Sequence, residues 1–208
     1  MEFQIVVARY NEDINWLNDY KDYCVIYNKG KFINCKNEIT LPNRGRESHT
    51  YLWHIINNYD KLAEITIFTQ ARIADHRGFN HDNVNHLINL KNEAQCNGKS
   101  TPEEYFHHHD NHYNCSQPDW NLCNGEFYLK DNYINNQHIL FIDWFKNHIL
   151  PEYPNPIKIY WNGIFAVKKE IILKKPKSYY QNLINQLFYH INPVEGHFFE
   201  RSWYYIFD

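Results

Sequence analysis

Residues 41–70 read LPNRGRESHTYLWHIINNYDKLAEITIFTQ, and they carry the pattern that decides the fold. Apolar side chains recur there at steps of three and four residues, which is typical of one face of an amphipathic helix. These side chains are Tyr51, Leu52, Ile55, Ile56, Tyr59 and Leu62. The apolar run 65–69 follows and has the length of a buried strand. The stretch is therefore predicted to form a loop, a helix and a strand.

Two further apolar runs precede this stretch. Residues 3–8 (FQIVVA) form a continuous run of strand length, and residues 24–27 (CVIY) form a second one. Between them, the apolar positions in residues 14–20 favour a short helix. An alternation of strands and helices is typical of an α/β layer architecture with right-handed crossovers. The predicted fold class is therefore an α/β domain with a mixed sheet flanked by helices.

Polar clusters follow each of these strands, at residues 9–13, 28–30 and 70–76. In sheets of this class, ligands bind in the crevice at the carboxyl ends of the strands, so we expect the three clusters to lie together there. Residues 44–49 (RGRESH) stand where the predicted helix begins. A helix N-terminus carries N–H groups and a partial positive charge that suit an anion. The alternative is an ordinary capped helix whose arginines are solvated.

Length, charge and cysteine content narrow the class of protein. A chain of 208 residues is predicted to form one domain, and its net charge of −3 gives no footprint for duplex nucleic acid. No apolar window has the length of a signal peptide core or a membrane span, so we expect a cytoplasmic protein with no membrane-spanning segment. The five cysteines lack a CxxC pair, which favours reduced thiols used for packing over a disulfide framework or a nucleophile.

A less regular, histidine-rich insertion is predicted at about residues 76–125 of the single domain 1–208. Residues 101–104 (TPEE) resemble a capping box with proline at the first helical position. Residues 107–112 (HHHDNH) have the side-chain types of a metal site, but only His108 and His112 stand four residues apart. A solvated polar tract is the default interpretation, and a metal site is the alternative.

Regular patterns return after residue 136. Apolar spacing predicts a helix over residues 139–149 that Pro151 ends, and residues 157–160 and 164–167 are strand-like. Ser178 with Gln181 resembles a capping box for another helix. Near the C-terminus, Glu200 and Arg201 stand among aromatic residues. They are either an ion pair that pins this segment or they include a carboxylate base whose pKa is raised by apolar surroundings.

Four motifs occur in order along the chain: ARYNED at 8–13, YNKG at 27–30, LPNRGRESHTYL at 41–52 and FERSW at 199–203. With these motifs the chain resembles a family catalogued as a domain of unknown function, found in eukaryotes, bacteria and large viruses. That family is similar to glycosyltransferases of the GT-A type, which have a Rossmann-like fold and use a nucleotide-sugar donor. The resemblance implies that the first strand and its following loop bind the nucleotide, while a late aromatic segment approaches a sugar or protein acceptor.

The resemblance implies three groups of site residues. The donor is expected to contact Arg9, Tyr10, Asn11, Glu12, Tyr27, Asn28, Lys29, Ser48, His49 and Gln70. The acceptor is expected to contact Trp161, Asn162, Gly163 and Trp203. Glu200 is the first candidate for the base that deprotonates the acceptor hydroxyl, with Glu12 or Asp13 as the second. Arg44 and Arg46 are expected to stabilise the departing diphosphate.

The chain departs from the GT-A pattern because it contains no Asp-x-Asp, the motif that commonly holds a divalent metal in those enzymes. Cationic side chains such as Arg9, Lys29, Arg44 and Arg46 could meet the diphosphate charge instead. Another interpretation is that Mn²⁺ or Mg²⁺ binds through Asp75, His76 or His197.

Two other functional classes stay open. One is a catalytically inactive module that binds a nucleotide or sugar, which the missing motif favours. The other is a metal-dependent hydrolase built on the histidine cluster and Asp75, although the chain lacks a recognisable paired-ligand motif.

Overall fold

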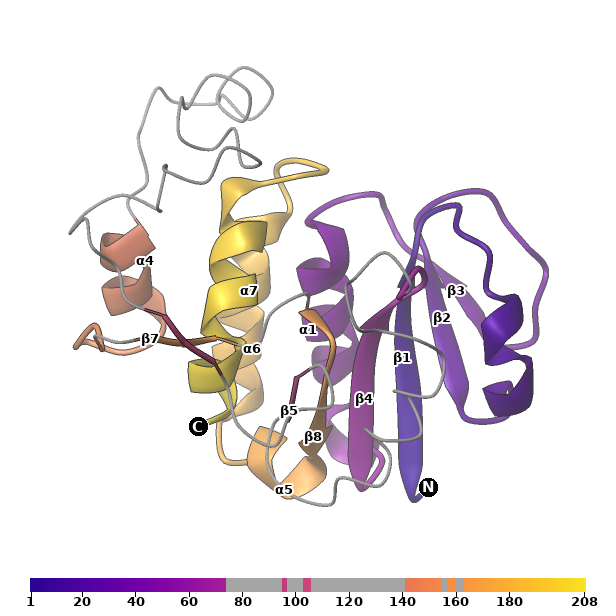
Figure 1. Cartoon of the computed structure of the whole chain (residues 1–208), viewed down its shortest axis with the longest axis horizontal. Helices are drawn as coiled ribbons and strands as arrows, with labels where there is room; N and C mark the ends of the chain where they lie inside the picture. The colour runs from indigo at the N-terminus through magenta and orange to yellow at the C-terminus, as the bar shows by residue number, and fades with distance from the viewer. Residues whose placement is uncertain (74–94, 97–102, 106–140, 155–156, 160–162) are drawn as a thin grey trace.

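The computed structural model describes residues 1–73, 95–96, 103–105, 141–154, 157–159 and 163–208 (Figure 1). Its centre is a six-stranded sheet in the order β3-β2-β1-β4-β8-β5. The strands are β1 (Phe3–Arg9), β2 (Cys24–Asn28), β3 (Glu38–Thr40), β4 (Ile65–Gln70), β5 (Gln95–Cys96) and β8 (Phe165–Lys168). The α/β class and the mixed sheet are therefore as predicted, and the short strand β3 is an element that the apolar pattern does not reveal.

The first four strands of this order run parallel, and their register aligns their carboxyl ends. Arg9 at the end of β1 stands opposite Asn28 at the end of β2, and Ala8 stands opposite Gln70 at the end of β4. Strand β8 runs antiparallel to β4, and β5 runs antiparallel to β8. The polar clusters that follow β1 and β2 and the described part of the cluster that follows β4 consequently meet at one edge of the sheet.

Helices cover both faces of the sheet, which explains why its central strands are apolar without alternation. Side chains alternate between the faces: Val6 and Phe68 belong to the core that contains α1, while Ile5 and Ile67 belong to a second core with Leu17 of η1. The helices of the first face are α1 (Arg46–Asn58), α6 (Lys177–Ile184) and α7 (Val194–Phe207), with α4 (Phe141–His148) packed on α7. The short helical elements are η1 (Asn15–Tyr20), η2 (Tyr59–Lys61), α5 (Lys169–Ile172) and η5 (Asn185–Leu187).

An aromatic layer joins α1, the sheet and α7. We define it by Tyr51, Phe68, Phe165, Phe199, Trp203 and Phe207. The ring centres of Phe165 and Trp203 are 5.2 Å apart, and those of Tyr51 and Phe68 are 4.9 Å apart. Helix α7 follows α1 by more than a hundred residues, so this layer is a long-range contact that packs the C-terminal helix against α1 and the sheet.

Two predicted helix starts are corrected by the structure. Glu103–Tyr105 form strand β6, which pairs antiparallel with β7 (Ile157–Ile159), so the pattern at 101–104 does not open a helix. A capping pattern is local, and it cannot anticipate a strand partner more than fifty residues away. Helix α6 forms as predicted, but it begins at Lys177 with Pro176 as its N-cap residue and without a side-chain cap hydrogen bond. Ser178 therefore lies inside the helix.

Most of the predicted insertion at 76–125, including the histidine run, lies outside the described residues. The predicted helix over 139–149 corresponds to α4 in its described part. Among the residues that the structure describes, no helix combines the length and the apolar character that crossing a membrane requires.

Candidate functional site

A cavity of about 410 Å³ opens where β1 and β4 end. The chain leaves β1 toward β2 on one side, while β4 lies on the other side, which makes this a topological switch point of the kind where α/β sheets bind ligands. The cavity is lined by Ala8, Arg9, Tyr10, Glu12, Lys29, Asn43, Arg46, Glu47, Gln70, Ala71, Arg72 and Ile191. These residues come from the ends of three strands, the start of α1 and the loop before α7.

Positive charge dominates the cavity. Arg9, Lys29, Arg46 and Arg72 contribute four cationic side chains against the carboxylates of Glu12 and Glu47. The first turn of α1 adds the partial positive charge of a helix N-terminus. The arrangement is suited to an anion with more than one negative charge.

Arg9 braces the loops that form one wall of the cavity. Its side chain is buried, and it donates from Nε to the Glu12 carbonyl (3.0 Å) and from Nη1 to Asn28 Oδ1 (2.8 Å). The same Nη1 also donates to the carbonyl oxygens of Tyr10 and Lys31. The guanidinium therefore ties the loop after β1 to the loop after β2, and its charge lies in the wall.

Gly30 allows these two loops to approach each other. A Cβ atom at this position would lie 1.7 Å from the Tyr10 carbonyl oxygen and 2.5 Å from Asn11 Oδ1. Asn11 Oδ1 accepts a hydrogen bond from the Lys31 amide (2.9 Å), which continues the same contact. Only glycine fits such a close backbone approach, and this accounts for the glycine of the YNKG motif.

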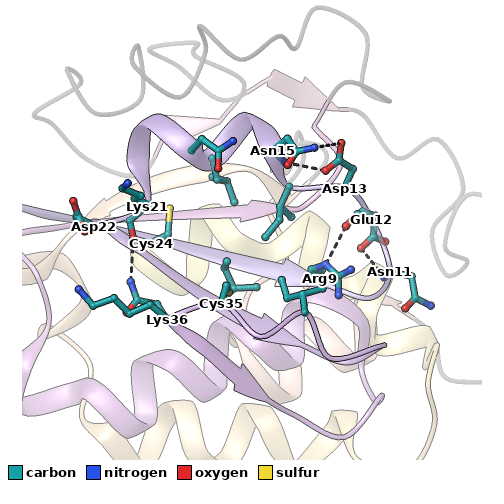
Figure 2. A pocket seen from close by; sticks show the side chains of 16 residues that line it. Arg9, Asn11, Glu12, Asp13, Asn15, Lys21, Asp22, Cys24, Cys35 and Lys36 are labelled. Atoms are coloured by element: carbon teal, nitrogen blue, oxygen red, sulfur yellow. Dashed lines mark hydrogen bonds between the residues drawn. The ribbon is translucent and has the colours of Figure 1, made fainter.

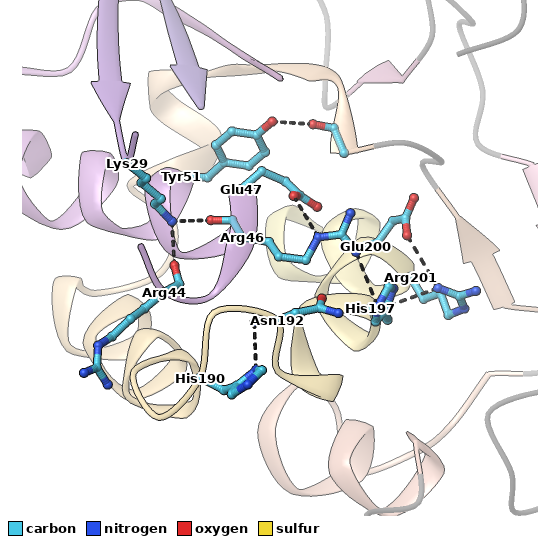
Figure 3. A network of polar contacts seen from close by, with 11 residues as sticks. Lys29, Arg44, Arg46, Glu47, Tyr51, His190, Asn192, His197, Glu200 and Arg201 are labelled. Carbon is cyan, nitrogen blue, oxygen red and sulfur yellow. Dashed lines mark hydrogen bonds and ion pairs between the residues drawn. The ribbon is translucent and has the colours of Figure 1, made fainter. Parts of the chain in front are cut away.

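Lys29 extends from the end of β2 to the turn before α1 (Figure 3). Its Nζ donates to the Arg44 carbonyl oxygen at 2.6 Å and also to the Arg46 carbonyl oxygen. Burial lowers the pKa of Lys29 to about 7, and the nearby Glu47 carboxylate partly opposes that shift. The lysine therefore changes its charge near neutral pH.

Arg46 reaches from the start of α1 toward the start of α7. Its Nε lies 3.5 Å from Glu47 Oε2, and its Nη1 lies 3.4 Å from His197 Nε2. Burial, together with the nearby charges of Arg46 and Arg201, lowers the pKa of His197 to about 2. His197 is thus a neutral ring between two guanidinium groups, and such a position is unfavourable for binding a further cation.

Glu200 stands one helical turn beyond Gly196, whose Cβ position would lie 3.9 Å from Arg46 Cδ. Its side chain is 15% exposed, and its Oε2 lies 3.7 Å from Arg201 Nη1. Arg201 also donates to the His197 carbonyl (3.0 Å). The ion pair that was one of the two interpretations of this motif is therefore present, on the face of α7 that approaches Arg46 (Figure 3).

The structure divides the predicted site residues into two groups. Those that line the cavity are Arg9, Tyr10, Glu12, Lys29, Arg46 and Gln70. Those that are buried away from it are Tyr27, Asn28, Ser48, His49 and Trp203. Tyr27 forms a hydrogen bond with His54 Nδ1 (3.0 Å), and the His49 ring stacks on Trp53. Burial lowers the pKa of His49 to about 3.

Four other predicted residues, Arg44, Gly163, Asn11 and Asp13, have distinct positions. The Arg44 guanidinium donates to the Phe188 carbonyl and points away from Arg46, so only its backbone contributes to the turn (Figure 3). Gly163 is buried, and its carbonyl accepts from Tyr51 Oη (2.8 Å) beside Glu47. Asn11 and Asp13 line a second cavity. The remaining predicted residues, Trp161, Asn162, Asp75 and His76, lie outside the described residues.

The second cavity has a volume of about 810 Å³ and lies on the other face of the sheet, under η1 (Figure 2). Its floor is apolar and includes Leu17, Cys24 and Ile26, and its rim is polar. Arg9 and Glu12 line both cavities, so the braced loop is a shared wall. Burial raises the pKa of the Cys24 thiol to about 12, which keeps it protonated and unreactive.

Six residues that line the cavity were not named as site residues from the sequence: Ala8, Asn43, Glu47, Ala71, Arg72 and Ile191. Asn43 and Glu47 belong to the quoted LPNRGRE motif, and Ala71 and Arg72 belong to the polar cluster 70–76 that was expected at this end of the sheet. Ile191 comes from a loop with no site motif, and only the packing of α7 brings it here. Within the described parts of the chain, the structure contains no group of three or more His, Cys, Asp or Glu that could hold a metal ion.

The chain belongs to the family described as "Protein of unknown function (DUF3431)", whose model matches residues 5–208. Searches of curated proteins and of solved structures give no match.

Proposed function

We propose that the cavity at the ends of β1 and β4 binds the diphosphate of a nucleotide-sugar donor, and that the protein transfers the sugar to an acceptor hydroxyl. The observation that carries the proposal is the convergence of Lys29, Arg46 and Arg72 on one cavity at the switch point of the sheet. The planar guanidinium of an arginine can bind two phosphate oxygens at once. Arg46 and Arg72 would contact the diphosphate in place of the missing Asp-x-Asp, while Lys29 Nζ donates to the carbonyl oxygens of Arg44 and Arg46.

The loop after β1 is suited to the nucleoside. Tyr10 is half exposed at the cavity, so its ring has an accessible face on which a base could stack. Arg9 Nη1 donates to the Tyr10 carbonyl oxygen in this loop, and Gly30 packs directly against the same carbonyl, so the backbone of the loop is fixed. A fixed loop reduces the entropy that is lost when a ligand binds.

Transfer also needs a carboxylate that accepts the proton of the acceptor hydroxyl. The hydroxyl oxygen then bonds to the anomeric carbon while the bond to the diphosphate oxygen breaks. Arg46 would stabilise the charge that develops on the departing diphosphate. Glu47 lines the cavity beside Arg46. Glu200 extends from α7 on the side of that helix that faces Arg46 (Figure 3). We propose these two residues as the candidate bases.

The first experiment is a thermal-shift screen with UDP, GDP, CDP and their sugars, each with and without Mn²⁺ or Mg²⁺. A ligand that binds only the folded state raises the free energy of unfolding, and with it the melting temperature. At a ligand concentration a hundredfold above Kd the added stability is about 2.7 kcal/mol. Arg46→Met should lose the shift, while Lys31→Met, a neighbouring exposed lysine outside the cavity, should keep it. A failure of every nucleotide to shift the protein would contradict the proposal.

Turnover then separates the two candidate bases. Glu47→Gln and Glu200→Gln should both bind donor, and the variant that removes the base should lose transfer by a hundredfold or more. Donor binding with neither transfer nor hydrolysis in the wild-type protein would instead favour the inactive binding module.

A further inference from the structure

The turn that opens α1, formed by Arg44, Gly45 and Arg46, holds two successive residues in the left-handed backbone region. Gly45 has φ of 60° and Arg46 has φ of 46°. Glycine adopts this conformation easily, but a residue with a Cβ atom pays about 1–2 kcal/mol for it. Such a conformation persists only when the surrounding structure holds it in place.

Hydrogen bonds hold the turn from two sides. On one side lies the loop before α7. The Gly45 amide donates to the His190 carbonyl oxygen of this loop (2.9 Å), and the Arg46 amide donates to the Ile191 carbonyl oxygen (3.3 Å). On the other side, Lys29 Nζ donates to the carbonyl oxygens of Arg44 and Arg46. Two distant segments of the chain therefore fasten the same short turn.

The geometry of the turn sets the direction of the Arg46 side chain. From this backbone the guanidinium reaches the cavity wall between Glu47 and His197 (Figure 3). If Arg46 adopted ordinary helical dihedrals, its Cα–Cβ bond would point elsewhere, because the direction of that bond follows φ and ψ. The clamp on the turn is thus also a clamp on the guanidinium.

We infer that Lys29 is a positioning residue: by binding the carbonyl oxygens of Arg44 and Arg46 it holds the left-handed turn and so places the Arg46 guanidinium at the cavity. What Arg46 binds there rests on the proposed function, whereas the clamp itself does not. The cost of burying an amine, visible in its lowered pKa, is consistent with a fixed task for this lysine.

The clamp is tested without any ligand by amide hydrogen exchange, measured by NMR. In Lys29→Met, the Gly45 and Arg46 amides should exchange at least tenfold faster, while the Leu52 amide inside α1 keeps its wild-type protection. Lys29→Arg can donate to two carbonyls and should restore protection to within threefold. Lys31→Met should match the wild type.

If Lys29→Met does not fold, the same exchange experiment uses Lys29→Gln, whose side-chain amide keeps one NH2 donor group. Unchanged exchange at residues 45 and 46 in a folded variant would overturn the inference.

The positioning role is tested by a double-mutant cycle with inorganic pyrophosphate as the probe, titrated calorimetrically at pH 6.5. If Lys29 acts through Arg46, Lys29→Met and Arg46→Met should each lower the affinity for pyrophosphate tenfold or more. The double variant should then bind pyrophosphate about as tightly as the single variant of lower affinity. Fully additive losses would mean that Lys29 contacts the anion independently, which overturns the positioning role. If wild-type protein does not bind pyrophosphate while exchange responds as expected, the clamp stands and the proposed function fails.

Discussion

The polar edge of the sheet and the aromatic layer beneath it treat buried polar groups in opposite ways. At the edge, Arg9 has four hydrogen-bond acceptors, and Asn28 donates to Lys31 and Glu38. Around the layer, several buried side-chain atoms have no hydrogen-bond partner in the described part of the chain. They are both ring nitrogens of His49, the hydroxyls of Ser48, Thr50 and Ser202, and Trp203 Nε1.

This difference indicates what maintains each region. The edge depends on specific hydrogen bonds, which fix loops in one conformation and suit a ligand site. The aromatic layer depends on packing, and the buried rings of His49 and His54 on helix α1 have to remain neutral. Perturbations that add charge should therefore damage the layer, and perturbations that remove a donor or add bulk should damage the edge.

The largest effect is expected from acid. Burial is the main cause that lowers the folded-state pKa of His49 and His54 to about 3 and of His197 to about 2, against an ordinary value of 6.5. Below pH 6.5 the unfolded chain takes up protons that the folded chain does not. The free energy of unfolding should therefore fall as the pH drops from about 6.5 toward 3, by about 1.4 kcal/mol per pH unit for each histidine and about 4 kcal/mol per unit for the three.

Urea denaturation at several pH values between 7.5 and 4.5 measures this slope. His49→Phe should reduce this slope by about a third, because it removes one of the three histidines. Phenylalanine suits the position because the His49 ring lies against Trp53 and Phe188. An unchanged slope in this variant would show that His49 does not control the acid sensitivity.

At the edge, Gly30→Ala should cost more than about 3 kcal/mol of stability, because the new methyl group would overlap the Tyr10 backbone and separate the braced loops. Gly196→Ala is the matched control. A Cβ atom there meets only Arg46 Cδ at 3.9 Å, and alanine favours a helix over glycine by about 1 kcal/mol. Thermal unfolding should show a large loss for the first variant and no loss for the second. Equal effects would contradict the close approach at Gly30.

Substitutions of two arginines in the same cavity are expected to affect different properties: Arg9→Met the stability of the fold, and Arg46→Met the affinity for an anion. Arg9→Met leaves buried carbonyl oxygens without a donor, so we expect it to lose about 2–4 kcal/mol of stability. The Arg46 side chain is 40% exposed and its ion pair with Glu47 is long, so Arg46→Met should cost less than about 1 kcal/mol. Pyrophosphate affinity should fall at least tenfold in Arg46→Met. Comparable stability losses in the two variants would show that burial does not distinguish them.

The smallest effect is expected from Arg46→Gly, and it has the opposite sign. Glycine relieves the left-handed backbone, so the melting temperature should rise by an amount equivalent to about 1 kcal/mol, while anion affinity falls as in Arg46→Met. A lower melting temperature would show that the side chain contributes more than the strain costs.

Local pattern alone was enough to predict much of this fold. Strand and helix periods follow from backbone geometry, so residues 3–8, 24–27 and 41–70 predicted their elements correctly. The positions of Arg9, Lys29 and Gln70 at strand ends were also predictable, because parallel strands bring their carboxyl ends to one edge. The motif order further indicated a family of unknown function, and the family match confirms it.

Tertiary structure alone decided which polar residues face the cavity and which are buried. Ser48 and His49 stand next to Glu47 in the sequence, yet they turn into the core because α1 packs between the sheet and the C-terminal helices. Ile191 and His197 reach the site only through the packing of α7, and β6 forms only because β7 is available as a partner. The physical reason is that exposure and strand pairing depend on contacts with distant segments, which no local period encodes.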